Sequence, residues 1–174
     1  MKYAKIKKTD VANGPGVRVS IFVSGCHHHC EGCFNSEAWD FNYGNDFTED
    51  TIQEIIEAMN HDYITGLSLL GGEPFELINQ KGLLPLLKKV KEVYPEKTIW
   101  AYSGFLYDEL KEMDYPETKE ILSLIDVLVD GKFVESLKDP NLYFRGSSNQ
   151  RVIDMKKTLK SKKIVLHEKN ARRN

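Results

Sequence analysis

Two patterns of hydrophobic residues alternate along the chain and predict strands separated by helices. Short apolar runs rich in β-branched and aromatic residues, bounded by turn residues, are typical of strands. The predicted strands are Val17–Val23, 64–70, 98–102, 125–129 and 163–166. Apolar residues that recur every three or four positions predict amphipathic helices. The predicted helices are 48–59, 83–94, 106–113, 117–124 and 149–160.

This alternation predicts an α/β domain built on a parallel sheet, because consecutive parallel strands need a crossover helix between them. The first four predicted strands end in glycine turns, at Gly25, Gly71-Gly72, Gly104 and Gly131. In parallel α/β folds the chemistry is found at the carboxyl ends of the strands. We therefore expect these glycines to share one rim of the sheet.

Length and composition are those of one ordinary soluble domain, which we expect to cover residues 1–174. Hydrophobic residues make up 41% and charged residues 29%, and the net charge of −2 gives no reason to expect nucleic-acid binding. From residue 151 onward the chain carries nine Lys or Arg against two Asp or Glu, a net of +7. This basic C-terminal tail either docks an acidic protein or is a solvated helix face with a frayed terminus.

Targeting segments are not apparent, and the cysteines are few. No apolar run approaches the roughly 20 residues that span a membrane, and the lysine-rich N-terminus lacks the apolar stretch of a secretory signal. We therefore expect a cytoplasmic protein without membrane partners.

All three cysteines lie within eight residues. An odd number in one group is no disulfide framework, so a reducing compartment favours metal or cluster ligation.

The cysteines have the spacing Cys26-x3-Cys30-x2-Cys33. Iron–sulfur clusters normally have four thiolate ligands, so a 4Fe–4S cluster on these three would leave one iron open to a substrate. An open coordination position is typical of a catalytic metal. Zinc is the alternative, because one of the three histidines at 27–29 would complete a Cys3His site. The spacing alone leaves both possibilities open.

Two glycine-containing segments beside the predicted rim favour the cluster over zinc. Gly71-Gly72-Glu73-Pro74 follows the second predicted strand. Its glycines let the backbone approach a ligand closely, so that carbonyls can accept from an ammonium group while Glu73 adds a carboxylate. The segment NGPGVR at 13–18 precedes the first predicted strand. Either segment alone is compatible with an ordinary turn. Their fixed order around one rim favours an iron–sulfur cluster over a zinc site.

This combination resembles the radical S-adenosylmethionine superfamily, whose hallmark is C-x3-C-x2-C followed by a GGE-type turn. Within it, the chain is similar to the activating proteins of anaerobic (class III) ribonucleoside-triphosphate reductases. Gly32 stands where many superfamily members have an aromatic residue, and the reductase activators share this glycine. The matching segments span nearly the whole chain: NGPGVR at 13–18, SGCHHHCEGCFN at 24–35, LLGGEP at 69–74, WAYSGF at 100–105, VDGKF at 129–133 and FRGSSNQRVID at 144–154.

The resemblance implies a fold and an oxidoreductase reaction. The implied fold is a partial (β/α) barrel with parallel strands, open on one side, since a complete eight-unit barrel typically needs about 250 residues. The open iron would chelate S-adenosylmethionine, and the reduced cluster would pass one electron to its sulfonium. The resulting 5′-deoxyadenosyl radical would abstract hydrogen from a glycine of the partner reductase, leaving a glycyl radical. A flavodoxin-type protein would supply the electron.

The resemblance also implies roles for individual residues. The cluster ligands would be Cys26, Cys30 and Cys33. The methionine amino group would be held by Gly71, Gly72 and Glu73. The backbone from Gly32 through Cys33 to Phe34 would contact the adenine.

Two assignments keep a second interpretation. Ser103 is either a ribose contact or a helix N-cap, a position that favours serine. The polar segment Arg145–Arg151 is either a docking or closing element or an ordinary surface loop. Two other functions also stay open. One is activation of another glycyl-radical enzyme, such as pyruvate formate-lyase, or radical chemistry on a small molecule. The other is a zinc-stabilised binding module without catalysis.

Overall fold

A single seven-stranded sheet organises the chain, in the order β3-β1-β2-β4-β5-β6-β7. The structure, a computed structural model, describes residues 1–173. The strands are β1 Lys2–Asp10, β2 Val17–Val23, β3 Asn45–Asp46, β4 Ile64–Gly71, β5 Thr98–Tyr102, β6 Val127–Asp130 and β7 Arg151–Asp154. The helices are α1 Glu49–Ala58, α2 Leu77–Val93, α3 Tyr107–Glu112, α4 Pro116–Leu124 and α5 Met155–Ser161.

The centre of the sheet is parallel and its edges are antiparallel. Strands β2, β4, β5 and β6 pair in parallel, whereas β1 pairs antiparallel with β2 and β3, and β7 pairs antiparallel with β6. The α/β class is therefore confirmed, with an open mixed sheet. The prediction of a purely parallel sheet was wrong at both edges, where hairpin-like or loop connections replace crossover helices.

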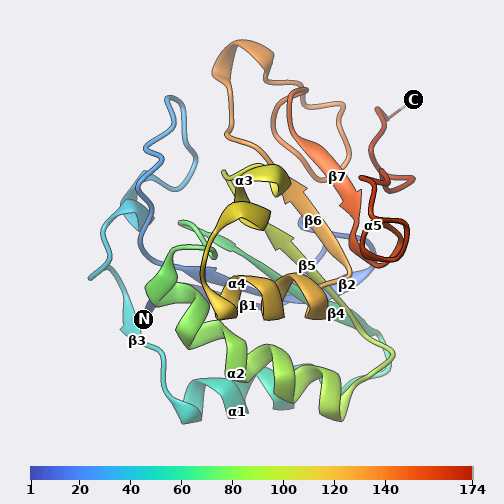
Figure 1. Cartoon of the computed structure of the whole chain (residues 1–174). Coiled ribbons are helices and arrows are strands. Elements are labelled where there is room, and N and C mark those ends of the chain that lie inside the picture. The colour runs from blue at the N-terminus through green and yellow to red at the C-terminus, as the bar shows by residue number, and fades with distance from the viewer. Residues whose placement is uncertain (174) are drawn as a thin grey trace.

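Helices α1, α2 and α4 lie over one face of the sheet and enclose the main core with it (Figure 1). That core contains the fully buried Ile21 and Leu67 from the sheet and Ile55 and Leu87 from the helices. The predicted period of α1 is confirmed, including Thr48 as N-cap. Helix α2 begins at Leu77, earlier than predicted, because its first turn buries polar residues that give no hydrophobic period.

The chain after β6 differs most from the sequence-based expectation. The region predicted as a helix at 149–160 divides into β7 and the short helix α5. The strand predicted at 163–166 is only one bridge, between Ile153 and Leu166. Residues 151–154 thus belong to the sheet, where Arg151 donates to Asp130 over 2.5 Å. The basic segment therefore begins as a paired strand.

A buried arginine ties the NGPGVR segment to the middle of the sheet. Arg18 is fully buried, and its guanidinium donates to Ser68 Oγ at 2.9 Å, to Leu67 O at 3.0 Å and to Thr98 O at 2.8 Å. Burial lowers the pKa of this guanidinium to about 10. The segment therefore has a structural reason to precede β2, because Arg18 joins β2 to β4 and β5.

Candidate functional site

A cavity of about 420 Å³ opens at the carboxyl ends of the parallel strands. The cysteine loop after β2 and the long segment after β6 both extend beyond this end of the sheet (Figure 1). The lining residues that the sequence had singled out include Asn13, Cys26, Cys30, Cys33, Phe34, Gly71, Gly72, Ser103, Gly104 and Gly131. The expectation that the cysteines and the strand-end glycines share one rim is confirmed.

The three thiols differ in their surroundings. Cys26 is buried, and Cys30 and Cys33 are half-buried. Burial raises the pKa of the Cys26 thiol to about 11, although backbone N–H groups of His28 and His29 oppose this rise. Burial also raises the pKa of the Cys30 thiol, against a hydrogen bond from the backbone of Phe133.

This donor set fits a cluster held by three thiolates. Backbone N–H groups point at sulfur, including that of Asn35, which donates to Cys33 Sγ over 3.4 Å. Such hydrogen bonds stabilise thiolate ligands. Each thiolate of a cluster binds an iron of its own, so the sulfurs surround the cluster instead of meeting at one ion. Within residues 1–173, no three His, Cys, Asp or Glu side chains are grouped to hold a single metal ion.

The histidines between the first two cysteines each have a different partner. His27 Nδ1 lies 2.9 Å from Glu76 Oε1, and His28 Nε2 lies 2.7 Å from Glu73 Oε1. The ring of His29 stacks on Trp39, with centroids 4.4 Å apart. The three rings therefore point in different directions, as expected for consecutive loop residues.

Glycine is required at the GGE turn by close backbone packing. Gly71 has φ +113°, and a Cβ there would lie 2.5 Å from the backbone nitrogen of Val23. A Cβ on Gly72 would lie 2.6 Å from the carbonyl oxygen of Gly25. Both glycines thus let β4 and its turn pass directly beside the start of the cysteine loop while they line the cavity.

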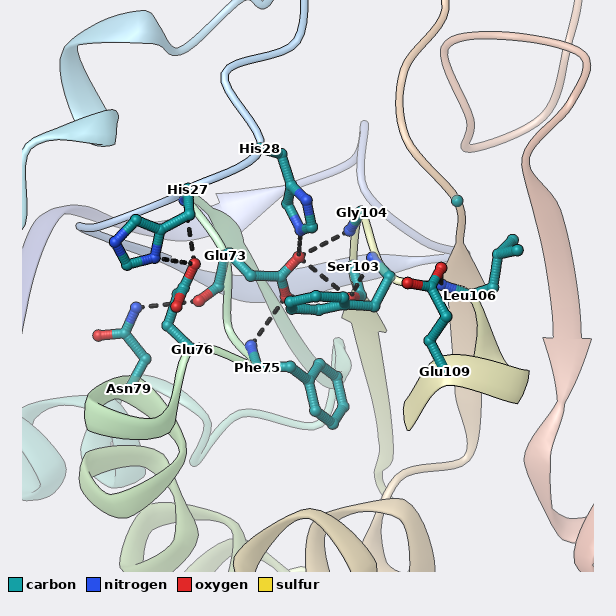
Figure 2. A network of polar contacts seen from close by, with 12 residues as sticks. His27, His28, Glu73, Phe75, Glu76, Asn79, Ser103, Gly104, Leu106 and Glu109 are labelled. Atoms are coloured by element: carbon teal, nitrogen blue, oxygen red, sulfur yellow. Dashed lines mark hydrogen bonds and ion pairs between the residues drawn. The ribbon is translucent and has the colours of Figure 1, made fainter. Parts of the chain in front are cut away.

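The carboxylate of Glu73 is fully buried and bonded within the protein (Figure 2). Its Oε1 lies 2.7 Å from His28 Nε2 and accepts from the Gly104 N–H at 2.7 Å. Its Oε2 accepts from the Phe75 N–H at 2.8 Å, and the Ser103 hydroxyl reaches both oxygens. Glu73 therefore joins the turn after β4, the end of β5 and the cysteine loop.

Ser103 lines the cavity but does not cap a helix. Helix α3 begins at Tyr107 with Leu106 in the N-cap position, so the N-cap interpretation of Ser103 was wrong. The Ser103 hydroxyl instead lies within hydrogen-bonding distance of Glu73 and accepts from the Phe105 N–H at 3.0 Å. Its position on the cavity wall keeps the ribose contact as a prediction.

Gly32 and Phe34 occupy the outer part of the cysteine loop. Gly32 has φ +76°, a left-handed conformation that favours glycine, and any Cβ would collide with the carboxylate of Glu135. Phe34 is 73% exposed, and its ring lies 5.6 Å from that of Phe133. The segment after β6 therefore closes against the outer cysteine loop.

Comparison with known proteins shows which family the chain matches. Residues 12–153 match the family model described as a 4Fe-4S single cluster domain. The anaerobic ribonucleoside-triphosphate reductase-activating protein of Escherichia coli K12 is 43% identical over 154 residues, which cover 87% of this chain and 97% of that protein. Proteins of the same name from Haemophilus influenzae and Enterobacteria phage T4 are 42% and 40% identical over 152 residues, covering 86% and 87% of this chain and 96% and 93% of theirs.

The chain belongs to the family of anaerobic ribonucleoside-triphosphate reductase-activating proteins. The match to a 4Fe–4S domain supports the cluster interpretation of the three cysteines over the zinc alternative. Among residues 1–173, no helix is both long enough and apolar enough to cross a membrane.

In this family member the far wall of the cavity comes from residues that the sequence did not single out individually. They include Tyr102 at the end of β5, Phe133 after β6, and Arg145 and Gln150 before β7. The Tyr102 hydroxyl is buried and has no hydrogen-bond partner among the described residues, and burial raises its pKa. Arg145 donates to Gln150 O over 2.6 Å. Tyr102 could have been anticipated as the last residue of a strand that points toward the rim.

Proposed function

We propose that this chain activates an anaerobic ribonucleoside-triphosphate reductase by generating a glycyl radical on it. A single observation supports this most strongly. Three thiols and the glycine turn after β4 line one cavity, in a chain that is similar along 87% of its length to proteins named for this activation. The cavity volume of about 420 Å³ is in the ordinary range for a small-molecule site.

The thiols of Cys26, Cys30 and Cys33 would hold the 4Fe–4S cluster by three of its irons. When bound, the cluster supplies the electron that cleaves S-adenosylmethionine into methionine and a 5′-deoxyadenosyl radical, which takes a hydrogen atom from a glycine of the reductase. The backbone N–H groups around the sulfurs stabilise the thiolates. A flavodoxin-type protein is the proposed electron donor.

The remaining cavity wall would position S-adenosylmethionine. Carbonyl oxygens at Gly71 and Gly72 are suited to accept from its ammonium group, and Ser103 is within the same wall for the ribose. The backbone of Gly32 to Phe34 is the proposed adenine contact, at the outer end of the loop. All of these residues lie in loops or at a strand end on one side of the sheet, so that one ligand can touch them together.

The open sheet suits a substrate that is itself a protein. We infer a partial (β/α) barrel, open on one side, which would let a backbone segment of the reductase reach the cavity. We also propose that residues 1–174 form one domain working in the cytoplasm. The basic segment from residue 151 would then contribute to partner docking only through its solvated side chains.

The decisive experiment mixes the anaerobically reconstituted protein with reductase, S-adenosylmethionine and a one-electron reductant. We expect a glycyl-radical doublet in the electron paramagnetic resonance spectrum of the reductase. A reductase variant with alanine at the radical glycine is the matched control. A doublet on pyruvate formate-lyase but none on the reductase would contradict the proposal in favour of a related activator.

A further inference from the structure

One side chain connects the cysteine loop to the ends of the neighbouring strands. The side chain of His28, midway between Cys26 and Cys30, is 7% exposed. Its ring lies edge-on to Phe105, with centroids 4.5 Å apart, and its Nε2 lies 2.7 Å from Glu73 Oε1. His27 differs sharply, because its side chain is 75% exposed and pairs with Glu76. The two adjacent histidines therefore face opposite environments.

The acceptor positions of Glu73 are occupied by groups of the protein itself (Figure 2). A carboxylate offers about four lone-pair positions and can only accept. Four donors from three segments converge on it: the ring N–H of His28, the Ser103 hydroxyl and the backbone N–H groups of Phe75 and Gly104. A carboxylate oxygen at 2.7 Å favours the His28 tautomer with its hydrogen on Nε2, in which the ring donates. An ammonium group would have to displace one of these donors.

We infer that Glu73 and His28 form a clamp that fixes the cysteine loop against the ends of β4 and β5. Glu73 is thus a positioning residue that acts through His28, and the ammonium of the substrate is left to the carbonyls of the glycine turn. This inference rests on the proposed function only where substrate binding is concerned. The clamp itself consists of contacts between protein groups.

Gly104 provides an independent way to disturb the clamp. A Cβ at this position would lie 2.5 Å from Cδ2 and 2.7 Å from Nε2 of the His28 ring. The backbone of Gly104 is not in the left-handed region, so alanine would be tolerated there except for this collision. The His28 ring therefore occupies space that is open only because residue 104 is a glycine.

The first test measures hydrogen exchange in the cluster-free protein. We expect His28→Ala to accelerate exchange of the amides in residues 26–33 about tenfold or more, the size expected for losing a hydrogen bond to a charged group. His27→Ala is the matched control, and its exchange in this loop should stay within about twofold of wild type. Equal protection in both variants would overturn the clamp, whatever partner the protein activates.

The second test compares two single variants, Gly104→Ala and His28→Ala, with the double variant that combines them. Gly104→Ala alone should accelerate exchange in the loop, because its methyl group displaces the His28 ring. In the Gly104→Ala, His28→Ala double variant that collision is gone, so loop exchange should be no faster than in His28→Ala alone. Additive acceleration would mean that Gly104 acts independently of His28, which contradicts the inference.

The third test separates a clamp from a direct ligand. S-adenosylmethionine binding to the reconstituted protein is followed through its effect on the electron paramagnetic resonance signal of the reduced cluster. The clamp predicts that His28→Ala weakens binding, and that the double variant with Glu73→Gln binds no more weakly than Glu73→Gln alone. Wild-type affinity in His28→Ala together with loss in Glu73→Gln would overturn the inference. Failure of reductase activation with these binding results intact would count only against the proposed partner.

Discussion

At the scale of single residues, the Cys26 thiol has to lose its proton when metal binds. Burial holds the pKa of Cys26 at about 11, so its thiol is protonated at neutral pH in the absence of metal. Metal ligation requires the thiolate, and the backbone N–H groups directed at the sulfur are already placed to stabilise it. The iron therefore supplies the main driving force for deprotonation.

Each cysteine should be indispensable. Replacing Cys26, Cys30 or Cys33 by alanine is expected to abolish reductive cleavage of S-adenosylmethionine, because two thiolates would leave the cluster without its third anchor. Methionine and 5′-deoxyadenosine are quantified by chromatography after anaerobic reduction. His27→Ala serves as a control with near wild-type cleavage. Retained cleavage in any cysteine variant would refute that ligand assignment.

The glycine turn should be equally intolerant of a side chain. Gly71→Ala is expected to lower the free energy of unfolding by about 2 kcal/mol or more, because it combines an unfavourable φ with a Cβ against Val23. Urea denaturation of the cluster-free protein measures this. Gly82→Ala in α2 is the control, since its φ is not in the left-handed region and the nearest atoms to its Cβ would be side-chain atoms of the N-terminal Met1, not backbone. An equal loss at both positions would contradict the argument.

Sequence spacing was sufficient to predict which cysteines and glycines meet at the cavity, because strand ends of a parallel sheet share an edge. It could not predict the contacts that Glu73 makes within the protein. A carboxylate beside two glycines suggests a ligand, whereas its four internal donors come from segments up to 45 residues away in sequence. The place of Phe133 and Arg145 on the cavity wall could not be predicted for a similar reason, although Arg145–Arg151 had been considered as a closing element, because both residues come from a loop whose path no local period encodes.

At the scale of elements, Arg18 links three neighbouring strands. Its guanidinium donates to oxygens on β4 and β5 from a fully buried position on β2. A lysine cannot make the same set of hydrogen bonds, because its ammonium group is compact and its hydrogens point in diverging directions, whereas the guanidinium is a planar fork of donors. The NGPGVR segment is thereby held against the middle of the sheet, where the Ser68 hydroxyl donates to Asn13 O at 2.6 Å and Asn13 lines the cavity.

Arg18→Lys should therefore destabilise the sheet. We expect the free energy of unfolding to fall by about 2–4 kcal/mol, the size associated with breaking a buried charged network. Arg172→Lys is the matched control, because Arg172 is exposed and pairs with Asp139, and a change within about 0.5 kcal/mol is expected there. Chemical denaturation at neutral pH compares the two, and indistinguishable stabilities would refute the role of Arg18.

The central elements were predictable and the edge strands were not, for a physical reason. Strands β2, β4, β5 and β6 are buried and have continuous apolar runs. In contrast, β1 carries lysines that suit a strand covered on its outer side only at Lys2 and Tyr3, by the two-residue edge strand β3. Residues 151–154 have the apolar pair Val152 and Ile153, which fits a helix period as well as a strand. Only pairing with β6 selects the strand, and that contact is invisible in the local sequence.

At the scale of the whole molecule, acid should weaken the attachment of β1 to β2. Burial alone would raise the pKa of Asp10, but hydrogen bonds from Ser20, Asn13 and the Ala12 N–H lower it below its ordinary value of 3.8. A carboxylate with a depressed pKa in the folded state stabilises the protein above its unfolded pKa. That contribution is lost as pH falls through the folded pKa.

The pH dependence of Asp10→Asn tests this linkage. We expect the variant to be less stable than wild type at neutral pH, and the difference to shrink progressively below about pH 4, where the wild-type carboxylate becomes protonated. Urea unfolding at several pH values measures the difference. Asp50→Asn in the exposed first turn of α1 controls for general charge effects. A difference that stays constant down to pH 3 would contradict the assignment.

The bonds that hold the cysteine loop join protein groups to one another, and this has a consequence for how the inorganic centre is acquired. In a zinc finger, metal uptake and folding are one equilibrium, because the chain without metal is unfolded. The clamp inferred above predicts that the two processes are separable in this protein. A carrier would then deliver a preassembled centre to an acceptor that is already folded, and a chain whose centre has been destroyed would remain a substrate for repair instead of being degraded and replaced.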